Sequence, residues 1–430
     1  MPARELPATP GTLEGWLAHI ERVHPQTIAM GLERVRVVQQ ALALTPQVPV
    51  ITVGGTNGKG SACMMLEAIL HHAGYQTGCY TSPHLLRYNE RVRIAREDAG
   101  DAQLIGAFAA VECARRQANV ALTYFEFGTL AAMKLFIDAR VEVMILEVGL
   151  GGRLDAVNVF EPDCAMVMSV ALDHMDYLGD TREKIGFEKA GIFRADKPAI
   201  CADSDPPQSL IAHANAIGAP LLLRGRDYHA MPMPNQWAYQ GPGGARHGLP
   251  WPALRGAYQL ANAAACIAAL DTLRDRLPVT MNNIRDGLLT AENPGRFQVL
   301  PGQPQVILDV AHNPHAAQAL ADSLKSMPRG GRTLAVFSML SDKDIAGVIA
   351  IMKPHIGHWY AASISGPRGS SAETLEQKLA AAGLTQITRC ASVAAAVQAA
   401  REAAGVDDKI LIFGSFYTVS EAMQALGVER

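Results

Sequence analysis

Paired cysteines and long apolar runs are both missing from this chain of 430 residues. Its seven cysteines are scattered and form no CxxC pair, which argues against a disulfide framework or a zinc site and favours the reducing cytoplasm. No run of about 18 apolar residues occurs, and the N-terminal residues contain no apolar signal core. We therefore expect neither secretion nor a membrane span.

An excess of charge of one sign is also missing. The 38 basic and 41 acidic side chains leave a net charge of −3, too little positive field to bind nucleic acid through its phosphates. Hydrophobic residues make up 49% of the chain, which is typical of a folded protein of two or three domains. We expect a monomer whose partners are small molecules, with no nucleic acid or membrane among them.

Apolar runs alternate with alanine-rich segments of helical period, a pattern that predicts an α/β fold with a mainly parallel sheet. The predicted strands are 49–53, 77–80, 142–147, 164–170, 198–201 and 220–223, and the predicted helices are 61–73, 103–118, 126–139, 181–190 and 207–217. The segment 225–256 is rich in proline and glycine and predicts short antiparallel strands. Two helices are expected after it, at 257–276 and 280–291.

A strong turn signal at Glu292-Asn293-Pro294-Gly295 marks the predicted domain boundary. A second αβ series follows it, with strands at 305–310, 333–338, 357–361 and 409–413 and helices at 314–326, 371–382, 393–404 and 416–425. We therefore expect a first domain over 1–293 with a mainly parallel sheet, and a smaller Rossmann-like, open-sheet α/β domain over 297–430.

A glycine-rich loop lies directly between the first predicted strand and the first predicted helix. It reads Gly54-Gly55-Thr56-Asn57-Gly58-Lys59-Gly60-Ser61. In a P-loop, backbone N–H groups surround phosphate oxygens, a lysine such as Lys59 reaches the β- and γ-phosphates, and a hydroxyl binds magnesium. Here Gly60 follows the lysine, so the hydroxyl comes one place late, at Ser61. The alternative is a plain glycine turn, but the strand–loop–helix context favours nucleotide binding.

The sequence also indicates which nucleotide to expect. A guanine-specific GTPase would carry an Asn-Lys-x-Asp string after a later strand, and none occurs. The nearest match, Asp342-Lys343-Asp344, is preceded by Ser341. ATP is therefore the predicted nucleotide.

Polar residues follow two predicted strands. Glu147 ends the strand 142–147, and Asp173 and His174 come shortly after the strand 164–170. Because α/β sheets bind ligands at the carboxyl ends of their strands, Glu147 and His174 are candidates to hold Mg²⁺ beside the P-loop. The alternatives are a solvated strand end for Glu147 and a structural role for His174.

The predicted helix 181–190 carries two lysines that face differently. Lys184 is spaced to pair with Glu188 on the outer face, whereas Lys189 lies four residues after Ile185 and shares its apolar, inward face. An inward lysine either forms a salt bridge or has a lowered pKa, so that its neutral amine can react or be carbamylated. Spacing alone leaves both interpretations open.

Nine segments lie in order over nearly the whole chain: GLERV (31–35), VGGTNGKGS (53–61), YTSPHLLRYNERVRI (80–94), LTYFEFGTL (122–130), ILEVGLGGRLDA (145–156), ALDHMDYLG (171–179), EKAGIF (188–193), PGRFQ (294–298) and DVAHNPHA (309–316). Together they resemble the bacterial dihydrofolate synthase/folylpolyglutamate synthase family of the Mur-ligase superfamily. The segment 122–130 is similar to the bifunctional branch rather than to purely polyglutamylating enzymes.

The resemblance implies an ATP-dependent amide ligase that adds L-glutamate to dihydropteroate and to the terminal glutamate of tetrahydrofolates through an acyl phosphate. It also implies that the domain 297–430 closes over ATP and binds glutamate. The implied nucleotide contacts are Gly55, Thr56, Asn57, Gly58, Lys59, Gly60, Ser61, Asn262, Arg296, Asp309 and His312. The implied Mg²⁺ ligands are Ser61, Ser82, Glu147 and His174, and the implied pterin-site residues are Thr123, Phe125 and Asp155. The implied catalytic residues are Lys59, His174 and a carbamylated Lys189.

One position departs from the family. Ala29 stands where we would expect an acidic residue, which weakens the predicted N-terminal lip of the pteridine site. Tyr124 and Phe125 have the alternative interpretation of core residues at a helix start. Other hypotheses are a Mur-type ligase acting on a cell-wall precursor, polyglutamylation alone, and a non-catalytic nucleotide switch. The segment 122–130 speaks against the cell-wall ligase, and Lys189 together with the second domain speaks against the switch.

Overall fold

The computed structural model describes residues 10–26, 28–256, 258–328 and 330–428. The chain divides into two compact units: the first holds the residues up to Trp251 together with Asn262–Thr290, and the second holds Pro252–Ala261 and the residues from Ala291 onward. The domain boundary predicted from the sequence puts residues 252–261 in the first domain, whereas they belong to the second unit. Tyr258 in this segment interacts electrostatically with Asp309 and Arg296, a long-range relation that a local pattern does not reveal.

The first unit is built on a mainly parallel sheet. Within the described residues this sheet has eight strands in the order β4-β3-β2-β5-β1-β6-β7-β8. Their bounds are β1 (Val50–Gly54), β2 (Thr77–Tyr80), β3 (Val92–Ile94), β4 (Glu97–Asp98), β5 (Val143–Glu147), β6 (Cys164–Val167), β7 (Ala199–Cys201) and β8 (Leu221–Leu223). Among the described strands, the antiparallel pairings lie at one edge, where β3 pairs with β2 on one side and with β4 on the other. The central strand β1 lies between β5 and β6 and is fully buried, as expected for its apolar, β-branched sequence.

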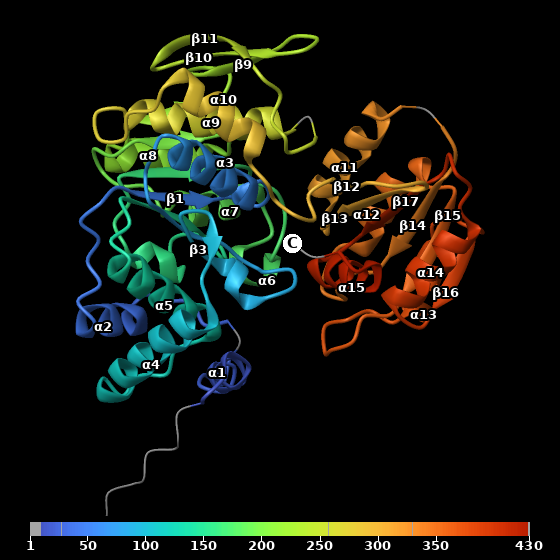
Figure 1. Cartoon of the computed structure of the whole chain (residues 1–430), viewed down its shortest axis with the longest axis horizontal. Helices are drawn as coiled ribbons and strands as arrows, with labels where there is room; N and C mark the ends of the chain where they lie inside the picture. The colour runs from blue at the N-terminus through green and yellow to red at the C-terminus, as the bar shows by residue number, and fades with distance from the viewer. Residues whose placement is uncertain (1–9, 27, 257, 329, 429–430) are drawn as a thin grey trace, which may run out of the picture. The chain divides into compact units, whose positions relative to one another are not determined.

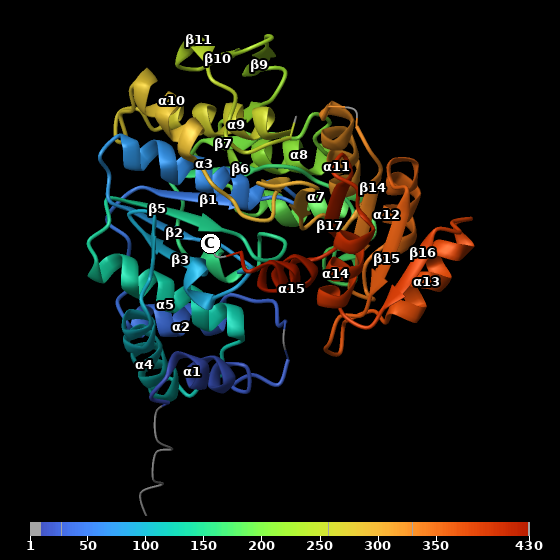
Figure 2. The same ribbon diagram turned by 45° about the vertical axis from the view of Figure 1, so that its right-hand side comes forward.

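Helices cover both faces of this sheet. They are α1 (Leu13–Ile20), α2 (Glu33–Ala41), α3 (Lys59–His72), α4 (Asp101–Gln117), α5 (Tyr124–Asp138), α6 (Met175–Leu178), α7 (Arg182–Ala190), α8 (Gln208–Ile217), α9 (Tyr258–Thr272) and α10 (Met281–Thr290), with the 3₁₀ turns η1 (Tyr88–Arg91) and η2 (Ala156–Val159). In Figures 1 and 2, α3, α9 and α10 lie on one face and α5 lies on the other. The mainly parallel sheet predicted for this part of the chain is confirmed.

A small antiparallel sheet of β9 (His229–Pro232), β10 (Trp237–Gly241) and β11 (Gly244–Leu249) follows the large one in sequence. It confirms the prediction for the segment 225–256. Asp271 of α9 holds this sheet in place, because its Oδ2 accepts hydrogen bonds from the Tyr239 hydroxyl at 2.9 Å and the Gly243 amide at 3.0 Å. Arg246 adds a charged contact to the same carboxylate.

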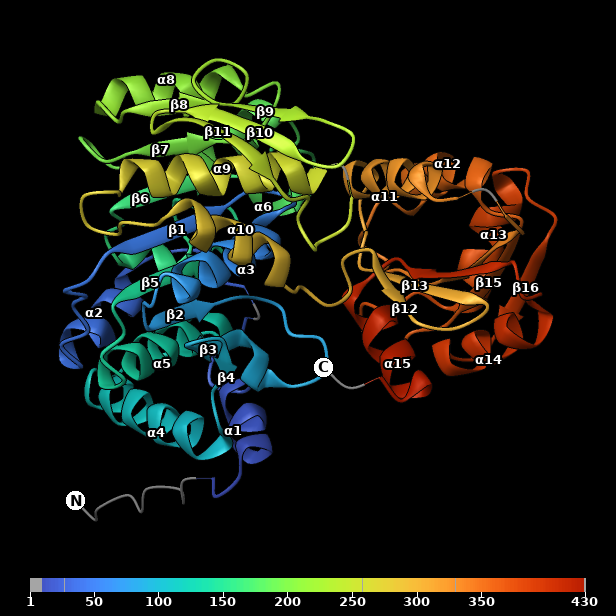
Figure 3. The same cartoon turned by 45° about the horizontal axis from the view of Figure 1, so that its top comes forward.

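The second unit contains a six-stranded sheet among its described residues, in the order β12-β13-β17-β14-β15-β16. The strands are β12 (Gln298–Leu300), β13 (Gln305–Asp309), β14 (Thr333–Phe337), β15 (His358–Ala362), β16 (Ile387–Cys390) and β17 (Lys409–Phe413). The helical elements are α11 (Pro314–Ser326), α12 (Ile345–Met352), η3 (Lys353–His355), α13 (Ala372–Ala381), α14 (Val393–Ala403) and α15 (Phe416–Leu426). In Figure 3, α11, α12 and α13 cover one face of this sheet and α14 and α15 the other.

Local sequence explains where several helices begin and end. Asn313 caps α11 by accepting a hydrogen bond from the Ala316 amide, and Pro314 occupies the first helical position. Gly218 ends α8 with φ 72°, a conformation that glycine adopts without strain. Among the described helices, none is both long and apolar enough to cross a membrane.

Candidate active site

The glycine-rich loop joins β1 to α3 at the carboxyl edge of the sheet. Gly55 and Gly58 have φ values of 139° and 90°, and a Cβ on Gly55 would lie only 3.0 Å from the Met168 amide nitrogen. Lys59 begins α3, and its Nζ donates to the carbonyls of Gly55 at 3.0 Å and Thr56 at 3.1 Å. A tight glycine loop, a helix N-terminus and a lysine folded back over the loop fit a phosphate group.

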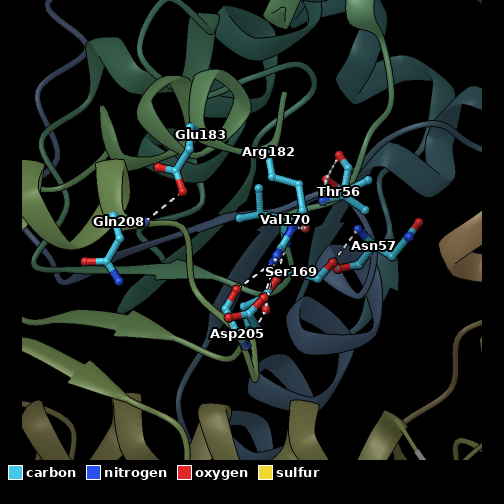
Figure 4. Close-up of polar contacts among 10 residues, drawn as sticks. Thr56, Asn57, Ser169, Val170, Arg182, Glu183, Asp205 and Gln208 are labelled. Atoms are coloured by element: carbon cyan, nitrogen blue, oxygen red, sulfur yellow. Dashed lines mark hydrogen bonds and ion pairs between the residues drawn. The ribbon is translucent and has the colours of Figure 1, made fainter. Parts of the chain in front are cut away.

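The loop is tied to the segment that follows β6. The Thr56 amide donates to the Ser169 carbonyl at 2.7 Å, and its hydroxyl donates to the Ala171 carbonyl at 3.1 Å. The Asn57 amide donates to the Ser169 hydroxyl at 2.9 Å (Figure 4). Thr56 and Asn57, predicted as nucleotide contacts, therefore also hold the loop on the sheet. This role was not predicted from the sequence, because the partners lie more than a hundred positions away.

Two further predicted nucleotide contacts of the first unit lie beside the loop. Ser61 is in the first turn of α3 and is 2% exposed. A Cβ on Gly58 would lie 2.9 Å from Oδ1 of Asn262, so the Asn262 amide group rests against the Gly58 backbone. The prediction is compatible with this geometry, and Gly60 lies between Lys59 and Ser61 in the same turn.

The predicted metal ligands end or follow the strands around β1. Glu147 is the last residue of β5, is 3% exposed, and accepts a hydrogen bond at 3.0 Å from the amide of Ser82, which follows β2. His174 precedes α6 with φ 51°, and its amide donates to Asp173 at 2.9 Å. Within the described ranges there is no group of three His, Cys, Asp or Glu residues suited to a metal. The predicted set combines hydroxyls with one carboxylate and one imidazole, and its oxygen atoms suit Mg²⁺.

Lys189 is buried on the inner face of α7, as its spacing from Ile185 predicts, and is 3% exposed. Burial, reinforced by the Lys59 ammonium, lowers the pKa of Lys189 to about 7, and the carboxylates of Asp173 and Asp155 oppose this shift. The amine therefore changes protonation near neutral pH.

On the outer face of α7, the predicted pairing of Lys184 with Glu188 is wrong. Lys184 does not pair with Glu188: its Nζ lies 2.8 Å from Oδ1 of Asp180, just before the helix. Glu188 instead pairs at 2.8 Å with Arg153, which comes from the loop after β5. The tertiary partner prevails because Gly152 brings that loop against the end of α7, where a Cβ on Gly152 would lie 2.8 Å from the Glu188 carbonyl oxygen.

Two predicted pterin-site residues lie at the glycine-rich turn after β5. Asp155 belongs to this turn, and Phe125 packs against it. The Asp155 carboxylate accepts hydrogen bonds from the amides of Leu150 at 2.8 Å and Val157 at 3.1 Å. Burial raises the pKa of Asp155 to about 7, against the opposing effect of these amides and of Lys59. The Phe125 ring covers Gly149, where a Cβ would lie 2.6 Å from the Phe125 Cζ.

Thr123 has a structural function that was not predicted from the sequence. It caps α5: its Oγ1 accepts from the Glu126 amide at 3.3 Å, while Glu126 Oε2 accepts from the Thr123 amide at 2.8 Å. The Thr-x-x-Glu spacing of a capping box was the available signal. Glu126 also pairs with Arg34 at 2.7 Å, and Arg34 donates to the Ala29 carbonyl at 2.8 Å. The segment around Ala29 is thus held through its backbone.

The second unit gathers its three predicted nucleotide contacts near the end of β13. Asp309 accepts from the amides of Phe297 at 2.8 Å and Ala311 at 2.7 Å. Burial raises the pKa of Asp309, and the Arg296 guanidinium opposes the shift. Arg296 lies over the Phe416 ring, 4.7 Å from its centre, and the His312 ring lies 6.3 Å from the same ring. Phe416 was not predicted, since an aromatic residue at a helix start reads as core.

The two α/β units, the first of which contains the P-loop, match the two domains of the Mur ligase family. The Mur ligase middle domain matches residues 53–270, and the Mur ligase, glutamate ligase domain matches residues 295–416. A dihydrofolate synthase/folylpolyglutamate synthase of Escherichia coli is 45% identical over 428 residues, covering 99% of this chain and 98% of the relative.

Solved structures agree over the same length. Escherichia coli FolC in complex with DHPP and ADP superposes with a TM-score of 0.93 at 45% identity, covering 98% of this chain and 99% of that one. A bifunctional folylpolyglutamate synthase/dihydrofolate synthase with Mn, AMPPNP and L-glutamate bound gives a TM-score of 0.90 at 44% identity, over 98% and 100%. The chain belongs to the Mur ligase family, in its branch of dihydrofolate synthases/folylpolyglutamate synthases.

Proposed function

We propose that this chain is an ATP-dependent amide ligase that adds L-glutamate to dihydropteroate, forming dihydrofolate, and to the terminal glutamate of tetrahydrofolates. The observation that carries the proposal is the arrangement at the carboxyl edge of β1 and β5. There a P-loop with Lys59 lies within electrostatic range of two buried groups, Asp155 and Lys189, whose pKa values are both near 7. Relatives that are 45% and 44% identical over at least 98% of this chain support the same reaction.

The reaction runs in two steps. Lys59 and the loop amides bind the β- and γ-phosphates while the acceptor carboxylate attacks the γ-phosphorus in line, giving an acyl phosphate and ADP. The neutral amine of glutamate then attacks the acyl carbon, the tetrahedral intermediate collapses, and phosphate leaves. When bound, Mg²⁺ neutralises charge on the phosphates. Ser61, Ser82, Glu147 and His174 are the residues that would hold it.

We propose further that Lys189 is carbamylated. Its lowered pKa leaves a large fraction of neutral amine near pH 7, and this amine forms a bond from nitrogen to the carbon of CO₂ with loss of a proton. The product is an anion. An ammonium group at Lys189 repels the Lys59 ammonium, whereas the carbamate attracts it. This attraction helps to hold Lys59, the metal and the substrate.

The pteridine site is proposed around Phe125 and Asp155. The Phe125 ring supplies a flat apolar surface for a heterocycle, and the buried Asp155 carboxyl can pair with adjacent N–H donors on its edge. Thr123 lies one residue before α5 and adds its hydroxyl to the same region. Ala29 carries no acidic group. We therefore propose that the backbone around Ala29, which Arg34 holds in place, forms the N-terminal lip of the site.

In the second unit we propose Arg296, Asp309 and His312 as nucleotide contacts. We also propose that the enzyme works as a monomer in the cytoplasm. All seven cysteines are free thiols, which suits a reducing compartment. Sedimentation of the purified protein would test the monomer.

The experiment that tests the function incubates purified protein with ATP, Mg²⁺, radiolabelled glutamate and either dihydropteroate or a tetrahydrofolate. We expect labelled amide product with both acceptors, and ADP in equal amount. Product with the tetrahydrofolate alone would reduce the function to polyglutamylation. Product only with a UDP-linked cell-wall precursor would make the chain a different Mur ligase, and absence of any ligation would contradict the proposal.

A further inference from the structure

The segment Ser169–Ala171 lies between the phosphate loop and the first turn of α7. On one side, Ser169 and Ala171 take hydrogen bonds from Thr56 and Asn57 of the loop. On the other side, the peptide groups of Val170 are engaged by side chains from elsewhere in the unit. In Figure 4, Thr56 and Asn57 lie on one side of Ser169 and Val170, and Asp205 lies on the other.

Two side chains, Arg182 and Asp203, hold Val170; we call them the Val170 clamp. Arg182 Nε donates to the Val170 carbonyl at 3.0 Å, and Asp203 Oδ2 accepts from the Val170 amide at 2.7 Å. Arg182 and Asp203 also contact each other at 3.3 Å, and Asp205 takes a further hydrogen bond from Arg182 at 2.8 Å. The Asp203 side chain is only 9% exposed, so its bond to Val170 is shielded from water.

Arg182, one of the two clamp residues, lies on the same face of α7 as Lys189. Arg182 precedes Lys189 by seven residues, which is two helical turns, and Ile185 and Gly186 between them are buried. The hydrogen bond from Arg182 to the Val170 carbonyl therefore ties the start of the helix face that carries Lys189 to the segment after β6. Val170 is also four residues before His174, so one guanidinium links the phosphate loop, the His174 segment and the Lys189 helix.

We propose that Arg182 and Asp203 are positioning residues for the ligase reaction: through Val170 they set the phosphate loop, His174 and Lys189 in register with one another. They touch neither substrate nor metal in this role. The inference rests on the proposed function, because it assigns these three groups to one reaction. Its physical basis is that small displacements of reacting groups cost large factors in rate.

The test compares Arg182→Gln with two matched controls in the same unit. Arg276→Gln removes an arginine from Asp163, whose Oδ2 accepts from the Val50 amide at 3.0 Å, so it loosens the opposite end of β1. Glu183→Ala removes the two hydrogen bonds that the Glu183 carboxylate accepts from the amides of Gln208 and Ser209, at 3.1 Å and 2.7 Å. The Ser209 hydroxyl still donates to the Glu183 backbone carbonyl at 2.7 Å, so the first turn of α7 stays tied to α8. Neither control alters the Val170 contacts.

We expect Arg182→Gln to lower kcat on the order of tenfold and to raise the Mg²⁺ concentration needed for half-maximal rate, with KM for glutamate unchanged. Asp203→Ala should act in the same direction. Arg182→Lys should recover part of the rate, since an ammonium can still reach the Val170 carbonyl. It also serves as the test variant if Arg182→Gln does not fold. The two controls should lose stability without these kinetic changes.

Titration calorimetry of ADP and Mg²⁺ binding tests this inference independently of the proposed function. If the wild-type protein makes no labelled product, the proposed function fails, whereas weaker ADP–Mg²⁺ binding in Arg182→Gln than in both controls still supports the clamp. The inference would be overturned if Arg182→Gln and the controls had the same kinetics, Mg²⁺ dependence and ADP binding.

Discussion

The carboxyl edges of the two large sheets each carry a buried aspartate, but the cations beside it differ. Asp155 in the first unit and Asp309 in the second both accept two backbone amides, and burial raises the pKa of each. Beside Asp155 lie two lysines, Lys59 and Lys189, whose ammonium groups interact with each other. Beside Asp309 lies Arg296.

The difference between lysine and arginine suggests different functions for the two sheet edges. A buried lysine can lose its proton, whereas an arginine guanidinium keeps its charge under all conditions that a protein survives. With the pKa of Lys189 lowered to about 7, the first edge can change protonation near neutral pH. The second edge offers a fixed positive charge stacked on Phe416. We therefore place the bond-making steps at the first edge and fixed-charge recognition at the second.

The largest expected effect comes from Lys59→Ala. Removing a charge contact at a developing negative charge lowers turnover by a factor on the order of 10² or more. The melting temperature should stay close to that of the wild type, because the Lys59 ammonium bonds only to carbonyls of its own loop among the contacts described. Arg296→Gln is the comparison from the second unit and should mainly raise KM for ATP. Near wild-type turnover in Lys59→Ala would contradict the P-loop assignment.

Lys189→Ala should be nearly inactive and partly rescued by a small added carboxylate such as formate or acetate, which replaces the lost carbamate. Lys184→Ala is the matched control on the same helix, since Lys184 pairs with Asp180 away from the site and should be dispensable. Mass spectrometry under CO₂, with mild trapping, should detect the modification at Lys189 and not at Lys184. An active Lys189→Ala variant together with an unmodified lysine would refute the carbamate.

Asp155→Ala should separate the two activities. If Asp155 pairs with the pterin edge, its loss should depress glutamate addition to dihydropteroate more than addition to a differently seated folate, by roughly tenfold. Asp309→Ala provides the contrast, because a nucleotide contact serves both reactions and should reduce both equally. Equal losses in Asp155→Ala would instead assign Asp155 to the shared nucleotide and metal site.

Local patterns were enough to predict the phosphate loop and the inward face of Lys189. The first follows from a strand, a glycine loop and a helix in sequence, and the second from a spacing of four residues to Ile185. Contacts between distant segments were not predictable in this way. The pairing of Glu188 with Arg153 and the hold of Arg182 on Val170 both depend on how loops meet in space.

Short elements were missed for a related reason. The strands β3 and β12 have three residues each, and α6 has four, so none of them is long enough to show a hydrophobic period. Phe416 shows the same limit for a single residue, because a ring stacked on a guanidinium is visible only once its partner is placed. The Thr123 cap is different, because its partner Glu126 is three residues away and the Thr-x-x-Glu spacing was readable from the sequence.

The smallest expected effect is on the pH dependence of stability. The pKa of Asp155 is about 7 in the folded protein against 3.8 normally, so between about pH 4 and pH 7 the folded state binds more protons than the unfolded state. Stability should therefore fall as pH rises through this window, by at most about 1.4 kcal/mol per pH unit for one group.

Asp155→Asn removes this titration and should flatten the fall, as measured by urea unfolding at intervals from pH 4 to pH 7. Lys189→Met tests the opposite sign in the same unit. With the pKa of Lys189 lowered from 10.5 to about 7, the unfolded state binds more protons between these values, so wild-type stability should rise from pH 7 to pH 10 and the variant should lack that rise. A wild-type profile that is flat in both windows would show that folding shifts the pKa of neither Asp155 nor Lys189, and would remove the titrating lysine that distinguishes the first edge from the second.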